Sequence, residues 1–391
     1  MNDAEKIINL LDAQALGRKL RLAREKRGLT QEEAAQIINV GRTTMINIEK
    51  GDRRVRPEEL VQLAIEYGRD VSEFVEEIRY EHLYTQPQFR GPEQYENEGD
   101  AEIEQWIEEL KDLAYSYYEI EQLLDAPLVK KYPAEYEIGR LKAEELGESI
   151  ALEERQRLGL GDKPIPVLRT LLEQEVGLRI YYLPLRPSKY SAIYVYSDHI
   201  GGCIAVNNQH PEERARMSLA HDYGHFLTSR YKPTLYNIEG YHSRRSENEK
   251  IADQFAVHFL MPTTGIMRRF TDIRKAKGKV TPYDLVEMAH YFGVSFEALS
   301  YRLEGLKLIP SGMLDHLNDE GFKVRDVQRR LGLEQLPASR QRLPLRHQLL
   351  AVEALDQGVI SENQLADLFE VDLLEAREIF STLRGQRLSF D

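Results

Sequence analysis

The sequence predicts a multidomain protein with an all-α N-terminal head, an α+β middle and an α-helical C-terminal tail. Its 391 residues exceed the size of one small domain. Apolar residues recur at helical spacing towards both ends, and three β-rich runs lie between them: LRIYYLPL, SAIYVYS and GCIAVN. The expected boundaries place the head at 1–80, a linker and an amphipathic helix at 81–140, the α+β domain at 141–270 and the helical tail at 271–391.

The composition is that of a globular protein with an acidic balance. The chain holds 52 Lys and Arg against 65 Asp and Glu, a formal net charge of −13. This argues against a general nucleic-acid coat protein but allows a basic patch on one domain. The single cysteine, Cys203, excludes an internal disulfide framework, and its β-rich surroundings favour a buried small residue over a nucleophile. Without a secretory start or an apolar run of about 18 residues, we expect a cytoplasmic protein that does not enter a membrane.

A helix-turn-helix is predicted near the N-terminus. Thr30 is the expected N-cap of its second helix, and Glu33 three residues later completes a capping box. A tight turn at 39–41 follows, and a third helix starts near Arg42 and stops at Gly51. The residues expected to be buried by the three helices are Leu16, Leu20, Ala23, Ala34, Ala35, Ile38, Met45 and Ile48.

Polar side chains at the start of the third helix fit DNA recognition, because this end of such a unit enters the major groove. Arginine can fork onto guanine, asparagine can pair with adenine, and threonine can contact the thymine methyl group. The predicted DNA-binding residues are Gln31, Arg42, Thr43, Thr44, Asn47 and Lys50, with Arg53, Arg54 and Arg56 as further phosphate contacts. The alternative is a helical protein-interaction module whose basic face is solvated.

The string LTQEEAAQIINVGRTTMINIEKGDRRVRPEELVQLAIEYGRDVSEFV resembles the xenobiotic-response-element family of phage-repressor-type regulators. Gly41 departs from it, since the family often has serine there, which puts one phosphate contact in doubt. The resemblance implies double-stranded DNA binding by a homodimer on a pseudo-palindromic operator.

Two histidines in the middle of the chain suggest a metal site. His221 and His225 stand four residues apart, so they share one helix face and can bind one ion. Glu249 heads a second helix whose face is otherwise apolar, and a carboxylate there needs a partner. Two histidines and one glutamate leave a fourth position open, which is the catalytic zinc pattern. The alternative is a pair of surface histidines, a spacing that also arises by chance.

The motifs His-Asp-Tyr-Gly-His and Glu-x-x-Ala-Asp-x-Phe-Ala-x-x-Phe-Leu-Met-Pro resemble those of the ImmA/IrrE family of zinc metallopeptidases, over about residues 145–305. The resemblance implies a zincin-like domain in which His221, His225 and Glu249 bind zinc, with manganese as the alternative ion. It places Asp222 at the catalytic base. Asp253 would orient one of these ligands without binding the metal itself, or it is an exposed helical aspartate.

Asp222 departs from the family, whose base is usually glutamate. The carboxylate is drawn back by roughly 1.5 Å, and such a displacement can cost about a hundredfold in rate. The outcomes are a slow peptidase, one with a rearranged water, or a metal-bound pseudoenzyme. Tyr223, Tyr241 and His242 are the candidates for stabilising the oxyanion, although each is also an ordinary packing or surface residue.

The two resemblances together imply a transcription regulator with a metallopeptidase domain that acts in a stress or mobile-element response. Such peptidases cut a repressor or antitoxin, and here the chain's own linker near 81–100 is a second substrate. The alternative is a non-catalytic regulator whose peptidase-like domain senses a ligand or partner. A third interpretation is a toxin-neutralising interaction partner.

Two further segments leave alternatives open. The helix around Trp106 either pairs with its copy in a dimer or packs against the peptidase domain. A basic stretch in the tail is a second nucleic-acid contact or a solvated helix face; it comprises Arg325, Arg329, Arg330, Arg340, Arg342 and Arg346.

Overall fold

The computed structural model describes residues 13–69, 71, 74, 101–139, 141–231, 235–238, 247–333 and 341–387. The chain forms two compact units, residues 1–86 and 87–391, and each is described by itself. The predicted segments 141–270 and 271–391 thus lie in one unit, together with residues 87–140 of the predicted linker segment. Within the described ranges, no helix is long and apolar enough to cross a membrane.

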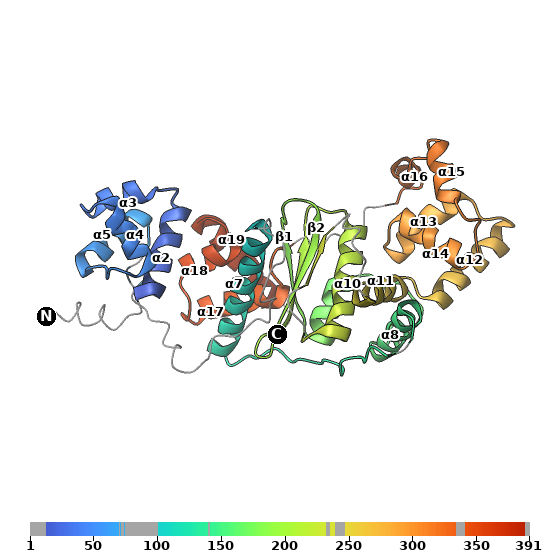
Figure 1. Cartoon of the computed structure of the whole chain (residues 1–391), viewed down its shortest axis with the longest axis horizontal. Helices are drawn as coiled ribbons and strands as arrows, with labels where there is room; N and C mark the ends of the chain where they lie inside the picture. Colours follow the sequence, from blue (N-terminus) through green and yellow to red (C-terminus); the bar gives the residue numbers. More distant parts are fainter. Residues whose placement is uncertain are drawn as a thin grey trace. The chain divides into compact units, whose positions relative to one another are not determined.

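In the part of the first unit that the structure describes, every regular element is a helix, as predicted (Figure 1). Its described helices are α2 (Ala13–Lys26), α3 (Gln31–Ile37), α4 (Arg42–Lys50) and α5 (Pro57–Tyr67). Thr30 and Glu33 form the expected capping box, and Gly51 ends α4 in the left-handed conformation. All eight residues expected in the core are buried.

Gly17 brings α2 and α4 together. A Cβ atom at this position would lie 2.5 Å from the carbonyl oxygen of Ile48 and 2.6 Å from that of Glu49. Only glycine allows this approach, because the obstacle is backbone that cannot move aside. The close crossing fixes α4, the helix expected to read DNA, on the rest of the unit.

A four-stranded sheet lies at the centre of the second unit, in the order β1-β3-β2-β4. β1 (Arg179–Leu183) runs parallel to β3 (Gly201–Asn207), whereas β2 (Tyr190–Ser197) is antiparallel to both β3 and β4 (Leu235–Ile238). The three β-rich runs are confirmed as strands. β4 was not predicted, because its four residues are too few to show an alternating pattern.

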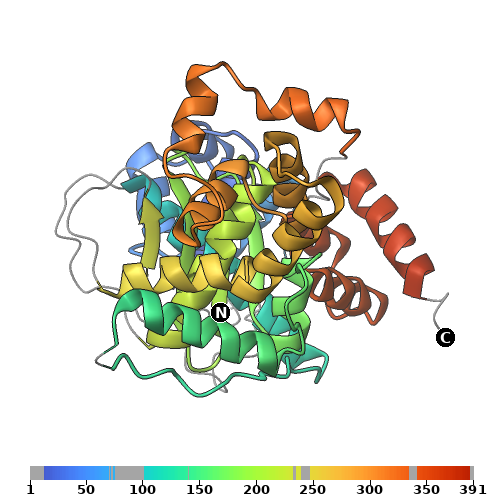
Figure 2. The same cartoon turned by 90° about the vertical axis from the view of Figure 1, so that its right-hand side faces the viewer.

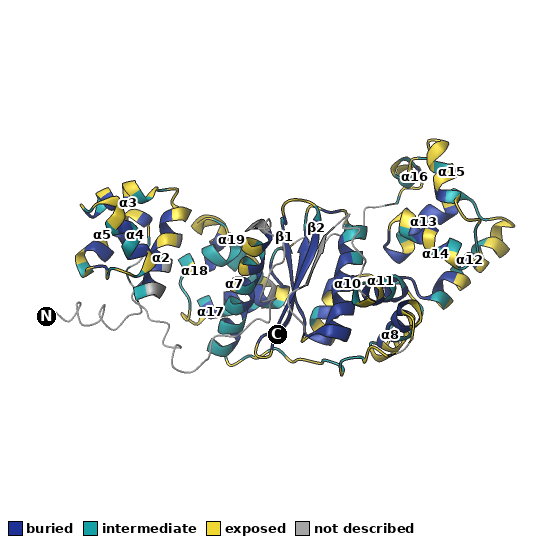
Figure 3. Ribbon diagram, viewed as in Figure 1, coloured by how far each residue is buried: buried dark blue, intermediate teal, exposed yellow. Residues whose placement is uncertain are grey.

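Both faces of the sheet are covered, and for this reason its first three strands are buried along their whole length (Figure 3). On one face, Tyr181, Ile193 and Cys203 pack against α7 (Ala101–Leu123). On the other face, Tyr182 and Val206 pack against α10 (Glu212–Ser229). The α+β middle is confirmed. The helix predicted around Trp106 is α7, and its apolar face packs against the sheet (Figure 1). Burial also raises the pKa of the Cys203 thiol to about 12, in line with a buried small residue.

Two glycines let three helices pack closely beneath the sheet. A Cβ at Gly147, on α8 (Ala143–Arg157), would lie 2.6 Å from Cβ of Gln254 on α11 (Glu247–Leu260). A Cβ at Gly224, on α10, would lie 3.1 Å from Cα of Ala252 on α11. α11 is therefore held between α8 and α10, and Figure 2 shows α8 and α11 side by side.

The remaining elements of the described second unit are helices, which confirms the α-helical tail. Two pairs of short helices pack together in this unit, α13 with α14 and α18 with α19. The remaining elements are α9 (Leu168–Leu171), the π-helical turn η1 (Leu172–Val176), α12 (Thr263–Lys277), α13 (Pro282–Phe292), α14 (Phe296–Gly305), α15 (Met313–Asp319), α16 (Val324–Arg330), α17 (Leu345–Asp356), α18 (Glu362–Phe369) and α19 (Leu373–Arg387).

Two arginines of the basic tail form ion pairs. Arg346 lies 2.6 Å from a carboxylate oxygen of Glu121 on α7, and the other oxygen of Glu121 is 2.6 Å from Arg179 on β1. Arg342 lies 2.9 Å from Glu109 on the same helix. These two side chains join the tail to α7, so neither is a free phosphate contact; Arg340 lies outside the described residues.

His347 makes the second unit sensitive to acid. Its ring stacks on Tyr117 with centroids 4.5 Å apart, and neither ring nitrogen has a hydrogen-bond partner among the described residues. Burial, and then the charges of Arg179 and Arg342, lower the pKa of His347 to about 3. The unfolded chain takes up this proton near pH 6.5, so the stability that the neutral ring provides is lost progressively as pH falls from about 6.5 towards 3.

We expect His347→Phe, which keeps the stacking ring, to remove about 2 kcal/mol of the difference in unfolding free energy between pH 7 and pH 5. Fluorescence of Trp106, the only tryptophan of the chain, reports urea unfolding of this unit. The exposed His199→Phe serves as the control. An unchanged pH dependence in His347→Phe would show that other groups cause the acid sensitivity.

Candidate metal centre and DNA-binding helix

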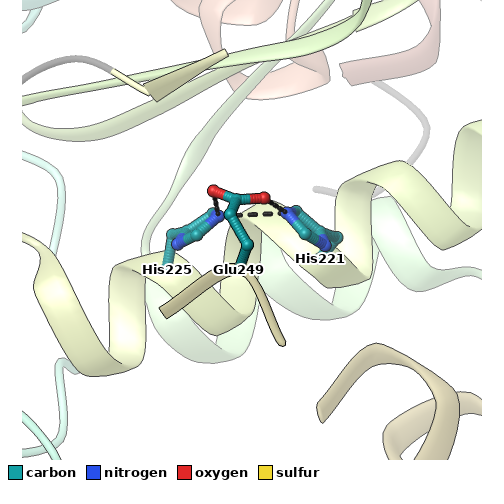
Figure 4. A group of neighbouring side chains, drawn as sticks. All are labelled: His221, His225 and Glu249. Atoms are coloured by element: carbon teal, nitrogen blue, oxygen red, sulfur yellow. Dashed lines mark hydrogen bonds and ion pairs between the residues drawn. The ribbon is translucent and has the colours of Figure 1, made fainter. Parts of the chain in front are cut away.

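Three side chains from two helices converge on one point (Figure 4). The Nε2 atoms of His221 and His225, both on α10, lie 3.0 Å apart. The carboxylate of Glu249, near the start of α11, spans them: Oε2 is 3.3 Å from Nε2 of His221, and Oε1 is 3.1 Å from Nε2 of His225. The helical spacing of the histidines and the close α10–α11 crossing at Gly224 together produce this arrangement.

Asp253 lies behind this group. Its Oδ1 is 3.0 Å from Nδ1 of His221, one helical turn after Glu249 on α11. A carboxylate in this position holds the Nδ1–H and directs the lone pair of Nε2 towards the convergence point.

Electrostatics tie the four side chains together. Burial lowers the pKa of His221, but hydrogen bonds to Asp253 and Glu249 outweigh it and raise the pKa to about 10. Burial raises the pKa of Glu249, but hydrogen bonds from His221 and His225 hold it well below its usual range. For His225 burial dominates and lowers the pKa. The Glu249 carboxylate and the two imidazoles therefore compete for protons at the point where they converge.

The donor set fits a divalent transition metal. Two imidazole nitrogens and one carboxylate oxygen, all within 4.8 Å of one another, are typical ligands of catalytic zinc. Tetrahedral zinc with bonds of about 2.0–2.1 Å separates its ligand atoms by roughly 3.3 Å, close to the spacing here. In the described part of the chain, these three residues are the group of metal-ligating side chains that meets this distance.

Asp222 follows His221 in the sequence. It is buried, with 1 % of its surface exposed. Its Oδ2 atom has no hydrogen-bond partner among the described residues. Burial raises the pKa of Asp222 to about 7, while His221 lowers it and Glu249 raises it. A carboxyl group in this state can take up and release a proton near neutral pH.

Tyr223 does not contribute to the metal centre. Its hydroxyl donates a hydrogen bond of 2.6 Å to Glu154 on α8 and accepts one of 3.1 Å from Arg157. Because residues two apart point to different sides of a helix, Tyr223 packs on α8 while His221 and His225 face Glu249. The hypothesis that Tyr223 stabilises an oxyanion is wrong on this geometry, and the other two candidates, Tyr241 and His242, lie outside the described residues.

The start of α4 carries the side chains predicted to contact DNA. Arg42 and Thr43, in its first turn, and Lys50, at its end, are exposed, and Thr44 and Asn47 are half-buried. This leaves the start of the helix accessible to a groove.

A buried ion pair holds α4 in place, and it was not predicted from the sequence. Glu49, 5 % exposed, lies 2.6 Å from Nε of Arg24 on α2 and accepts a hydrogen bond of 2.8 Å from the amide of Gln31. A charged residue at a core position of α4, next to Ile48, was the available signal. Gln31 thus ties the start of α3 to α4, whereas Arg53 donates two hydrogen bonds to Glu59 and is held inside the domain.

Comparisons with known proteins agree with the two predicted modules. The family model described as a helix-turn-helix domain matches residues 15–76, and the model described as an IrrE N-terminal-like domain matches residues 173–304. No curated protein matches the sequence at a significant level.

Among solved structures, a chain of PlcR from Bacillus thuringiensis, in complex with the peptide PapR7 and DNA, is 14% identical. The match covers 96% of this chain and 98% of that one, with a TM-score of 0.17. A score this low does not establish a common fold.

The family matches cover the elements that carry both sets of side chains. α3 to α5 and all but the first two residues of α2 lie within the first match, and β1 to β4 with α10 to α13 lie within the second. The predicted resemblance to both families is confirmed. Residues 15–76 of this chain form a helix-turn-helix domain, and residues 173–304 form an IrrE N-terminal-like domain.

Proposed function

We propose that the chain is a transcription regulator whose IrrE-like domain is a zinc-dependent endopeptidase. It would cleave a partner repressor or antitoxin, or its own linker near 81–100, in a stress or mobile-element response. The convergence of His221, His225 and Glu249 on one point carries this proposal, because that donor set leaves a coordination position for substrate chemistry. Zinc is the proposed ion, and manganese is the alternative.

The chain's own residues would divide the work as follows. His221, His225 and Glu249 would hold the metal, which when bound would polarise a carbonyl and acidify a water molecule. Asp253 would keep Nε2 of His221 directed at the metal through Nδ1–H. Asp222 would take up the proton at its carboxylate, where Oδ2 has no other partner in the described ranges.

A direct test measures bound metal and cleavage together. The purified chain, loaded with zinc or manganese, is incubated with a candidate repressor or antitoxin, next to a His221→Ala control. Fragments produced by the wild type alone support the peptidase. Intact repressor and intact chain in both samples, with zinc bound to the wild type, contradict it.

A non-catalytic regulator is the second candidate, and Asp222 favours it. The shorter side chain is 1 % exposed, so it is sealed among its neighbours rather than extended towards a substrate. In this case metal or partner binding would change operator affinity without cleavage. Equal operator affinity with and without zinc would exclude the metal as the bound signal.

For the helix-turn-helix domain we propose that a homodimer reads a pseudo-palindromic operator through α4. Arg42→Ala should lose about 1–3 kcal/mol of discrimination between operator and altered bases, because Arg42 would contact a base edge. Lys50→Ala should weaken all sequences alike and lower the salt slope by about one, because Lys50 would contact phosphate. Binding titrations at several salt concentrations measure both quantities.

Arg21→Ala is the matched control for these titrations. Arg21 is exposed on α2, where it lies 2.9 Å from Glu25. Its replacement should leave both discrimination and salt slope unchanged. Equal losses for Arg42→Ala at all sequences would contradict its base-reading role.

A further inference from the structure

A cavity of about 490 Å³ opens directly beside the candidate metal centre. His221, one of the three candidate ligands, and Asp253, which lies against its Nδ1 atom, form one part of its wall. From there it follows the groove between α10 and α11, past Met217 and Val257. α14 closes it on the other side with residues that the sequence analysis did not single out: Ala298, Tyr301, Arg302 and Gly305.

The walls nearest the metal suit an apolar stem. Met217, Val257 and Ala298 are partly exposed, and Tyr301 is 57% exposed. Ala298 and Gly305 are small, so α14 leaves space instead of filling the groove with its own side chains. An unbranched side chain of a few methylene groups can pack there.

Arg302 supplies a fixed hydrogen-bond donor in this wall. One of its terminal nitrogens donates to Oγ1 of Thr263 at 2.7 Å, and both terminal nitrogens lie 3.2–3.3 Å from the ring nitrogens of His258. Its Nε–H has no acceptor among the described residues. Thr263 and His258 therefore orient the guanidinium, but they do not accept hydrogen bonds from all of its N–H groups.

The charges lining the cavity balance. Asp253 is paired with His221, which leaves Glu144 on α8 and Arg302 as the remaining charged groups of the lining. An acidic ligand would meet Glu144, and a basic ligand would meet Arg302. A neutral amide can accept from a guanidinium and donate to a carboxylate, so it satisfies both.

We propose that this cavity is a substrate subsite that binds the side chain next to the scissile bond and prefers an unbranched side chain ending in a neutral amide, as in glutamine. The proposal rests on the metallopeptidase function. Arg302 and Glu144 are its specificity-determining residues, and Met217, Val257 and Tyr301 hold the stem. The residues that line the cavity therefore predict an amide side chain next to the cleaved bond.

The test uses probes that anchor on zinc and need no turnover. Two series, acetyl-Xaa-hydroxamates and mercaptoacetyl-Xaa-amides, place the variable side chain on either side of the metal, with Xaa as Gln, Leu, Glu or Ala. Calorimetry with the zinc-loaded full chain measures binding. In one series the Gln probe should bind about tenfold more tightly than the Leu and Glu probes, as expected for one net hydrogen bond.

Variants then locate the preference. Ala298→Phe fills the cavity and should remove the preference for Gln while zinc content stays the same. Ala276→Phe is the matched control, because Ala276 is exposed on α12 and lies outside the cavity lining. The control should keep the tenfold preference.

The possible results separate the two hypotheses. Probes that bind without preferring Gln, or whose preference survives Ala298→Phe, overturn the subsite and leave the metallopeptidase standing. No binding by any probe to the zinc-loaded chain overturns both, because it shows that the metal has no open position.

Discussion

Glu249→Gln is expected to abolish stoichiometric zinc binding, whereas Asp253→Asn should retain zinc with an affinity lowered about 10- to 100-fold. The difference follows from geometry: Glu249 lies 3.1–3.3 Å from both histidine Nε2 atoms, while Asp253 reaches only Nδ1 of His221. Loss of a ligand removes a bond to the metal, and loss of an outer carboxylate only loosens the imidazole. Elemental analysis and competition with a chromophoric chelator measure the two effects.

Glu247→Gln is the control for both variants, because Glu247 is an exposed carboxylate on the same helix and lies 2.5 Å from Lys250. It should bind zinc like the wild type. If Glu249→Gln kept its zinc at full affinity, the two histidines would be binding the ion without this carboxylate, and the open-site pattern would fail.

Features encoded by short-range patterns could be predicted from the sequence. The capping box at Thr30 and Glu33, the left-handed stop at Gly51 and the core face of α4 depend on residues a few positions apart. His221 and His225 belong to the same class, because a four-residue spacing on a helix fixes a shared face.

The pairing of Glu249 with the histidines joins residues on two different helices. It could be predicted only because a carboxylate on an apolar face requires a partner. The structure adds what brings the helices together, namely the small residues Gly224 and Ala252 at the α10–α11 crossing.

Features that depend on tertiary partners could not be predicted. Tyr223 stands between two candidate ligands in the sequence, yet its hydroxyl is held by Glu154 and Arg157 from α8. Arg342 and Arg346 form a basic stretch in the sequence, yet carboxylates more than 200 positions earlier pair with them. In each case the local pattern is correct, and a distant residue decides the role.

Asp222→Asn should lower cleavage by about 10²- to 10⁴-fold while zinc stays bound, because the amide cannot accept the proton, whereas His221, His225 and Glu249 are unchanged. Asp222→Glu tests the opposite change. It restores the methylene group that this chain lacks, and a gain in reach of roughly 1.5 Å can raise the rate by up to about a hundredfold. Timed digestion of the repressor and zinc content measure both variants.

The Asp222 pair also separates the two candidate functions. A peptidase that uses Asp222 loses activity in Asp222→Asn. A metal-binding regulator without catalysis shows no activity in the wild type, and cleavage by Asp222→Glu alone would then identify the short side chain as the cause. Asp222 is only 1 % exposed, so the longer side chain should cost about 1–3 kcal/mol of stability, which Trp106 fluorescence monitors. Cleavage by Asp222→Asn at the wild-type rate would instead mean that another group accepts the proton, and Asp222 would be a packing residue of α10.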